Sequence, residues 1–138
     1  MKQVIDNFTW AAIEHDADGV SGEYYRRLRE EKKLCTTKCK KCGHVSYPPR
    51  PFCPACFSEE IEWAEIGRGA TLYAFTVQTR SLRFMKPDVI GIVDIPGVGR
   101  ILSKINGKFE DMKIGLKLKF EPFQVSDKIT VHTFTPVA

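Results

Sequence analysis

Two short cysteine pairs constrain this chain more than any other feature. Cys39 and Cys42 form a C-K-K-C turn. Cys53 and Cys56 form a C-P-A-C turn ten residues later. Two residues between paired cysteines allow both sulfurs of a tight turn to point at one ion, and two facing turns supply the four thiolates of a closed tetrahedral site. The segment 43–52 suits a short hairpin that lays the second turn over the first. The spacing therefore predicts one structural Zn²⁺ held by these four residues.

Other uses of the cysteines remain open at this point. The same four sulfurs bind rubredoxin-type iron. A redox dithiol usually sits at the start of a helix in a βαβ unit, and neither pair precedes a helical apolar pattern. Disulfides belong to exported proteins, and the chain shows no exporting signal. The fifth cysteine, Cys35, does not fit a tetrahedral site, so we interpret it as a small buried residue on the strand that enters the ribbon.

Size and charge restrict the class of protein. The chain has 138 residues, enough for one compact domain or two very small ones. No apolar run reaches the ~18 residues that a membrane span requires. The start of the chain carries acidic residues and no long apolar segment, so we expect no secretory signal and a cytoplasmic protein. The net charge of +4 favours an anionic partner: nucleic acid, a phosphorylated cofactor or an acidic protein surface.

The N-terminal third is predicted to be helical. Asp6 can cap a first helix over 8–17, and Gly19 follows as a stop. Ser21 can cap a second helix that runs to about Lys32. The apolar stripe of this second helix consists of Tyr24, Tyr25 and Leu28. Its remaining charged face is interpreted as solvated.

Beyond the ribbon the pattern changes to alternating apolar and polar residues, as in strands. Five strands are expected over residues 70–79, 89–95, 100–105, 116–120 and 129–134, with a short helix over 109–112. On the first of these strands, Tyr73, Phe75 and Val77 share one face. Alternation places the rings of Tyr73, Phe75 and Phe120 in the core.

This element order predicts the fold class. The order β-β-β-α-β-β is that of an OB-fold, a small five-stranded barrel, although an SH3-like barrel has similar strand content. We therefore expect a mainly β protein with N-terminal helices, in which a rubredoxin-like zinc ribbon precedes an OB-fold barrel. The expected divisions are a helical segment 1–33, the ribbon 34–62 and the OB-fold 63–138.

The ribbon and the first barrel strand also resemble a known family. The matching stretches are C-K-K-C-G, P-P-R-P-F-C-P-A-C, the tryptophan at Trp63, G-R-G-A-T-L-Y-A-F-T-V, and the later I-G-I-V-D-I and K-I-G-L-K-L-K-F. They are similar to the zinc-ribbon/OB-fold family of acyl-CoA-associated proteins, and the resemblance covers most of the chain. One position departs from the pattern: Phe57 stands where the family commonly has glycine. We expect it to strain the second cysteine turn without removing a ligand.

The resemblance implies an accessory role and no active site in this chain. Members of the family are found with thiolases and hydroxymethylglutaryl-CoA synthases, and hold these two enzymes together. The implied function is a non-catalytic protein that binds acyl-CoA, or bridges the two enzymes so that acetoacetyl-CoA passes between them, or both.

The residues agree with a non-catalytic protein. The three histidines, His15, His44 and His132, are isolated from one another in the sequence. No HExxH, GxSxG or P-loop pattern occurs. His44 is interpreted as a surface residue, because four thiolates already close the metal shell.

The loop between the first two barrel strands is the candidate ligand site. Arg80, Arg83 and Lys86 supply cations there, and the apolar residues between them are Leu82, Phe84 and Met85. This mixture suits the phosphates and the pantetheine arm of coenzyme A, or the surface of a partner protein.

Two further functions stay open. Single-stranded nucleic-acid binding would need Tyr73, Phe75 and Phe120 exposed beside a basic groove. Electron transfer would need iron in the four-sulfur site.

Overall fold

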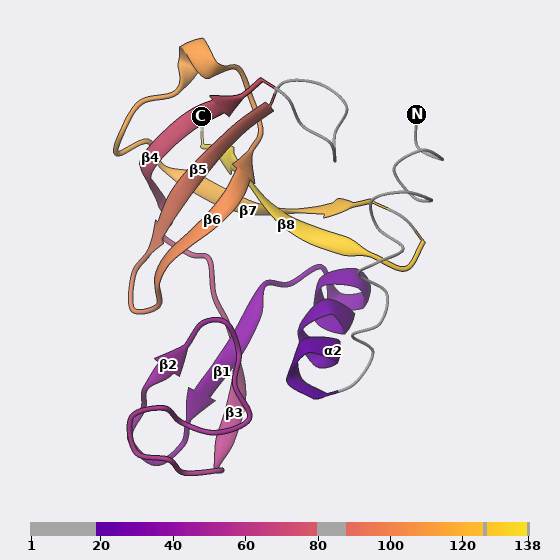
Figure 1. The fold of residues 1–138 in the computed structure, drawn as a ribbon, viewed down its shortest axis with the longest axis vertical. Helices are drawn as coiled ribbons and strands as arrows, with labels where there is room; N and C mark the ends of the chain where they lie inside the picture. The colour runs from indigo at the N-terminus through magenta and orange to yellow at the C-terminus, as the bar shows by residue number, and fades with distance from the viewer. Residues whose placement is uncertain (1–18, 80–87, 126, 138) are drawn as a thin grey trace.

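A computed structural model describes residues 19–79, 88–125 and 127–137. The predicted helix over 8–17 and the loop residues Arg80, Arg83 and Lys86 lie outside these ranges. Figure 1 shows a three-stranded ribbon sheet at one end of the molecule, a five-stranded sheet at the other, and helix α2 beside the ribbon. Within the described part of the chain, no helix has the length and apolar character needed to cross a membrane.

The second predicted helix is present, but it begins earlier than expected. Helix α2 spans Gly19–Arg26 and continues as a π-helical segment, Arg27–Glu31. Gly19, expected as a stop, is therefore already helical, and Ser21 lies inside the helix and not at its cap. The helix ends near the predicted position because Lys32 adopts a left-handed conformation with φ 57°.

The charged face of the helix is solvated and internally paired. The Arg26 guanidinium contacts the carboxylates of Glu23, Glu30 and Glu31 at 2.7–2.9 Å. Because these groups are substantially exposed, such pairs contribute little to stability. The opposite stripe points inward: Tyr24 and Leu28 are buried, and the hydroxyls of Tyr24 and Tyr47 lie 3.0 Å apart.

The ribbon is a small antiparallel sheet with the strand order β2-β1-β3. Strands β1 (Cys35–Cys39), β2 (Val45–Ser46) and β3 (Ile61–Glu65) form it. Strand β1 is central and pairs with β3 over its whole length, from Cys35 opposite Glu65 to Cys39 opposite Ile61. Strand β3 crosses the expected ribbon–barrel boundary at 62/63.

The second sheet has the strand order of an OB-fold. Its strands are β4 (Thr71–Gln78), β5 (Asp88–Ile95), β6 (Gly99–Ile105), β7 (Leu118–Gln124) and β8 (Thr130–Pro136). They run in the order β4-β5-β6-β8-β7, with β6 and β8 parallel and the other neighbours antiparallel. A bridge between Thr71 and Lys117 joins the two outer strands and closes the barrel. A 3₁₀ turn, Phe109–Asp111, stands where the short helix was predicted. These features confirm the five-stranded OB-fold.

One prediction for the barrel core is wrong. We expected Tyr73 and Phe75 in the core, but Tyr73 is 47% exposed, and Val77, on the same predicted face of the strand, is 37% exposed. The pairing of β4 with β5 shifts between Leu72 and Ala74, so a β-bulge places Tyr73 outside the regular alternation. Leu72 enters the core in its place, with 1% exposure. Phe75 is half-buried and its ring centroid lies 5.5 Å from that of Phe109.

One continuous core joins the helix, the ribbon and the barrel. Tyr24, Leu28 and Leu34 belong to the same buried cluster as Ile105 and Phe134 of the barrel. The backbone N–H of Ile66 donates to the carbonyl oxygen of Leu34 at 2.8 Å, at the junction between the ribbon strands and the barrel strands. The ribbon is therefore packed against the barrel and is not merely tethered to it.

Gly91 permits the close packing of the barrel wall. A Cβ at this position would lie 2.8 Å from Leu72 Cδ1, 3.0 Å from the Ala74 carbonyl oxygen and 3.0 Å from Ile105 Cγ1. The barrel wall therefore has no room for a side chain at residue 91.

We expect Gly91→Ala to lower the free energy of unfolding by about 1–3 kcal/mol, because the extra methyl overpacks a closed core. Urea denaturation measures the change. Thr76→Ala, an exposed change on the neighbouring strand, is the control and should shift stability by no more than about 0.5 kcal/mol. Equal stability of Gly91→Ala and the parent would contradict this packing.

Candidate metal centre

Two similar backbone turns position the four cysteines. Cys39 ends β1, and the N–H of Gly43 donates to its carbonyl oxygen at 3.0 Å. In the second turn the N–H of Phe57 donates to the carbonyl oxygen of Cys53 at 2.8 Å. Gly43 and Phe57 both have positive φ, 79° and 62°. Each turn thus reverses the chain directly after its second cysteine.

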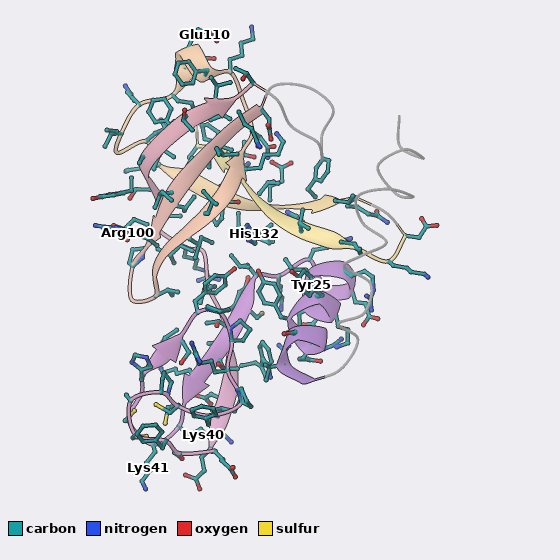
Figure 2. The ribbon with its side chains drawn as sticks, viewed as in Figure 1. Tyr25, Lys40, Lys41, Arg100, Glu110 and His132 are labelled. Atoms are coloured by element: carbon teal, nitrogen blue, oxygen red, sulfur yellow. The ribbon has the colours of Figure 1, made fainter. Side chains whose placement is uncertain are left out.

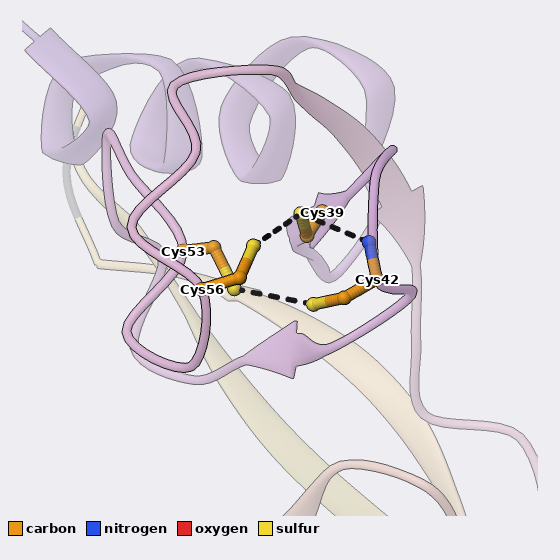
Figure 3. Close-up of side chains that lie close together, drawn as sticks. All are labelled: Cys39, Cys42, Cys53 and Cys56. Atoms are coloured by element: carbon orange, nitrogen blue, oxygen red, sulfur yellow. Dashed lines mark hydrogen bonds between the residues drawn. The ribbon is translucent and has the colours of Figure 1, made fainter.

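The turns bring the four sulfurs to one point, as Figure 3 shows. The Sγ atoms of Cys39, Cys42, Cys53 and Cys56 all lie within 4.8 Å of one another. Two of the separations are 3.6 Å (Cys39 to Cys56) and 3.5 Å (Cys42 to Cys53). A disulfide requires about 2.05 Å, whereas a tetrahedron of thiolates about 2.3 Å from a metal places sulfurs about 3.8 Å apart. The four side chains therefore fit a tetrahedral ion and are not paired as disulfides.

Backbone N–H groups favour the thiolate form of these cysteines. Cys39 Sγ accepts from the N–H groups of Cys42 and Lys41 at 3.4 and 3.3 Å. The N–H of Cys42 is the main reason that the pKa of Cys39 is lowered to about 7. Cys53 Sγ accepts from the N–H of Ala55 at 3.4 Å.

Mutual repulsion opposes a fully ionised cluster. The N–H of His44 lowers the pKa of Cys42, but hydrogen bonding to the Cys53 sulfur and burial raise it to about 12. A divalent cation removes this conflict, because it neutralises the thiolates that the protein alone cannot hold together. Zn²⁺ and rubredoxin-type iron both suit such a donor set. The arrangement is that of a structural metal centre.

Cys35 lies apart from the cluster, as predicted. It begins β1 and is 2% exposed. Burial raises the pKa of its thiol, while a hydrogen bond with the Arg27 guanidinium opposes the shift. The same guanidinium lies 5.2 Å from the centroid of the Trp63 ring. Cys35 is therefore part of the packing between the helix and the ribbon.

The histidines form no second site in the described part of the chain. His44 is exposed and its carbonyl oxygen accepts from the N–H of Cys39 at 2.9 Å. His132 Nδ1 lies 2.8 Å from the hydroxyl of Ser103, and burial lowers the His132 pKa to about 4, so its ring is neutral at pH 7. His15 lies outside the described residues. Among those residues, no other group of three or more histidine, cysteine or acidic side chains has metal-binding spacing.

The aromatic rings considered for nucleic-acid stacking have different environments. Tyr73 is exposed, but the Arg100 guanidinium already lies 3.6 Å from its ring centroid. Phe75 and Phe120 are half-buried and pack against the core. The sequence pattern did not reveal the Tyr73–Arg100 pair, because it depends on the bulge in β4.

Phe57 is strained, as its departure from the family pattern suggested. A residue with a Cβ in the left-handed region costs about 1–2 kcal/mol relative to the right-handed one. The first turn avoids this cost with Gly43. The second turn nevertheless brings Cys53 and Cys56 to the other two cysteines, with all four sulfurs within 4.8 Å of one another.

Replacement of one ligand tests the metal centre. We expect Cys39→Ser to lose the bound metal and unfold the ribbon, because structural zinc supplies on the order of 10 kcal/mol in small modules of this kind. Cys35→Ser is the matched control and should keep the parent's metal content. Elemental analysis by mass spectrometry gives the metal-to-protein ratio, and circular dichroism follows unfolding. A freshly purified parent protein without bound metal would contradict the assignment.

Family models match both parts of the chain. A model described as "ChsH2, rubredoxin-like zinc ribbon domain" matches residues 27–62, and one described as "ChsH2, C-terminal OB-fold domain" matches residues 63–121. In structure the chain is similar to a protein described as "Ltp2-ChsH2(DUF35) aldolase", with a TM-score of 0.73 and 21% identity over 85% of this chain and 94% of that one. This likeness concerns the fold.

The chain is similar to two relatives, the second of which spans most of it. It is 35% identical over 71 residues to the benzoylsuccinyl-CoA thiolase subunit BbsA of Thauera aromatica, an alignment that spans 51% of this chain and 49% of that subunit. It is 31% identical over 100 residues to a DUF35 domain-containing scaffold protein of Methanocaldococcus jannaschii. This alignment covers 69% of this chain and 71% of the relative. With both the zinc ribbon and the OB-fold in place, this chain belongs to the DUF35 family.

Proposed function

We propose that this chain is a non-catalytic scaffold subunit that binds an acyl-CoA thiolase and a hydroxymethylglutaryl-CoA synthase, so that acetoacetyl-CoA passes between them. The observation that carries the proposal is a closed four-cysteine centre joined to an OB-fold in a member of the DUF35 family. Relatives named as a scaffold protein and as a thiolase subunit support it.

The chemistry of the metal centre supports a structural role. Catalytic zinc keeps an open position for water or substrate, whereas four protein thiolates fill the tetrahedron. We propose that the ion is Zn²⁺, held by Cys39, Cys42, Cys53 and Cys56. An ion so enclosed stabilises the ribbon and offers no site for a reacting group.

The Ser103–His132 pair also suits a structural role. Ser103 is buried, and its hydroxyl lies near the carbonyl oxygens of Lys104 and His132 as well as the His132 ring. A nucleophilic serine needs access to substrate as well as an adjacent base. This buried hydroxyl joins β6 to β8 within the barrel.

Bridging is tested by mixing the three purified proteins of one host. We expect the thiolase, the synthase and this chain to co-elute as one large species in size-exclusion chromatography, because the chain offers a surface to each enzyme. Omission of this chain should separate the two enzymes. If the enzymes associate equally well without it, or if it binds neither, bridging is wrong. Tight, salt-dependent binding of single-stranded DNA would then favour a nucleic-acid function.

The basic loop is proposed to hold the phosphate end of the CoA thioester. We expect Arg80→Ala combined with Arg83→Ala to weaken acetoacetyl-CoA binding, since each buried charge-assisted contact contributes about 1.5–3 kcal/mol. Isothermal titration with the partner enzymes present measures the affinity. Lys119→Ala, which removes an exposed cation from β7, is the control. Equal affinity of the double variant and the parent would exclude a direct contact from this loop.

A further inference from the structure

The two cysteine turns have the same backbone geometry but differ in the residue that follows the second cysteine. They share the spacing C-x2-C, the N–H to carbonyl hydrogen bond and a positive φ at the residue after the second cysteine. Gly43 occupies this position in the first turn and Phe57 in the second. Gly43 therefore shows which residue the backbone prefers, and Phe57 shows a departure that backbone stability does not explain.

Side-chain packing does not explain Phe57 either. Its side chain is 74% exposed and belongs to neither buried apolar cluster. A strained residue that gains nothing from the fold is typical of a functional position, where the strain presents a group for contact. The exposed ring is such a group.

The surroundings of Phe57 define a surface. Residues 40–43 and 54–57, which we call the ribbon tip, are all exposed. Figure 2 shows Lys40 and Lys41 at this end of the ribbon, away from the barrel. The tip thus combines one aromatic ring with two cations, and it borders the exposed acidic residues Glu59 and Glu60, the second of which accepts from the Lys40 N–H through its carbonyl oxygen at 2.9 Å.

We infer that the ribbon tip is the surface that docks on the thiolase, with the Phe57 ring inserted in an apolar pocket rimmed by acidic side chains. Aromatic side chains in pockets supply most of the binding energy at such interfaces, and rim charges set orientation and association rate. This inference rests on the proposed function, because it names the surface that meets the thiolase.

A protein pocket fits the ring better than a small ligand does. A ring on a convex tip offers its faces and edge to a partner that surrounds it. Small-molecule sites are concave and bury most of the ligand. Binding of acetyl-CoA to the isolated chain, lost in Phe57→Gly, would overturn the inference.

Replacement of Phe57 separates strain from binding. Phe57→Gly and Phe57→Asn both suit a left-handed backbone and remove the ring. We expect both to keep the parent's metal content and to unfold at an equal or higher urea concentration. We expect their affinity for the host's purified thiolase, measured by biolayer interferometry, to fall at least tenfold. Phe57→Tyr keeps the ring and should bind within threefold of the parent.

Ile114 provides a matched control. Its side chain is also 74% exposed, but it lies in the turn before β7 of the OB-fold, away from the ribbon tip. We expect Ile114→Asn to bind the thiolase within threefold of the parent. An equal loss of affinity in Ile114→Asn would overturn Phe57 as the anchor.

The outcomes separate the inference from the proposed function. If the parent binds the thiolase and metal-loaded Phe57→Gly or Phe57→Asn binds it as tightly as the parent, the inference fails while the proposed function stands. Loss of metal in both variants would overturn the strain argument. If the parent itself binds no thiolase, both proposals fail.

Discussion

The convergence of four cysteine thiols on one point is the constraint on which the ribbon depends. The ribbon strands are short: β2 has two residues, and β1 and β3 have five each. Such a sheet buries little apolar surface of its own. Thiolates held within 4.8 Å of one another repel unless a cation neutralises them. Binding of the proposed metal and folding of the ribbon would therefore be one equilibrium, as in other small metal-bound modules.

Packing against the barrel and the helix sets the orientation of the ribbon. Leu34, directly before β1, is fully buried, and its carbonyl oxygen accepts from Ile66, directly after β3. Tyr24 and Leu28 of the helix complete the same core. Packing at this junction places the ribbon tip at one end of the long axis and the turn near Glu110 at the other, as Figure 2 shows. An elongated subunit with two separated ends suits the proposed contact with two partners, and a closed metal shell suits a protein that performs no chemistry at the metal.

The sequence by itself predicted which four cysteines lie together, the fold class and the number of barrel strands. Cysteine spacing is local, so two residues between paired ligands predict the turn whatever the rest of the chain does. Alternation and turn residues located all five barrel strands, because each strand has one face toward the core. The strain at Phe57 was visible through the family resemblance, since the family commonly has glycine at this position.

Only the tertiary structure decided which side chains face outward and what joins the parts. The bulge at Tyr73 depends on how β4 pairs with β5, and one extra residue moves a side chain from the core to the surface. The Tyr24–Tyr47 contact depends on segments 23 residues apart in the chain. Local periodicity carries no record of such pairings, because their energies arise only when the strands and the helix meet in the folded state.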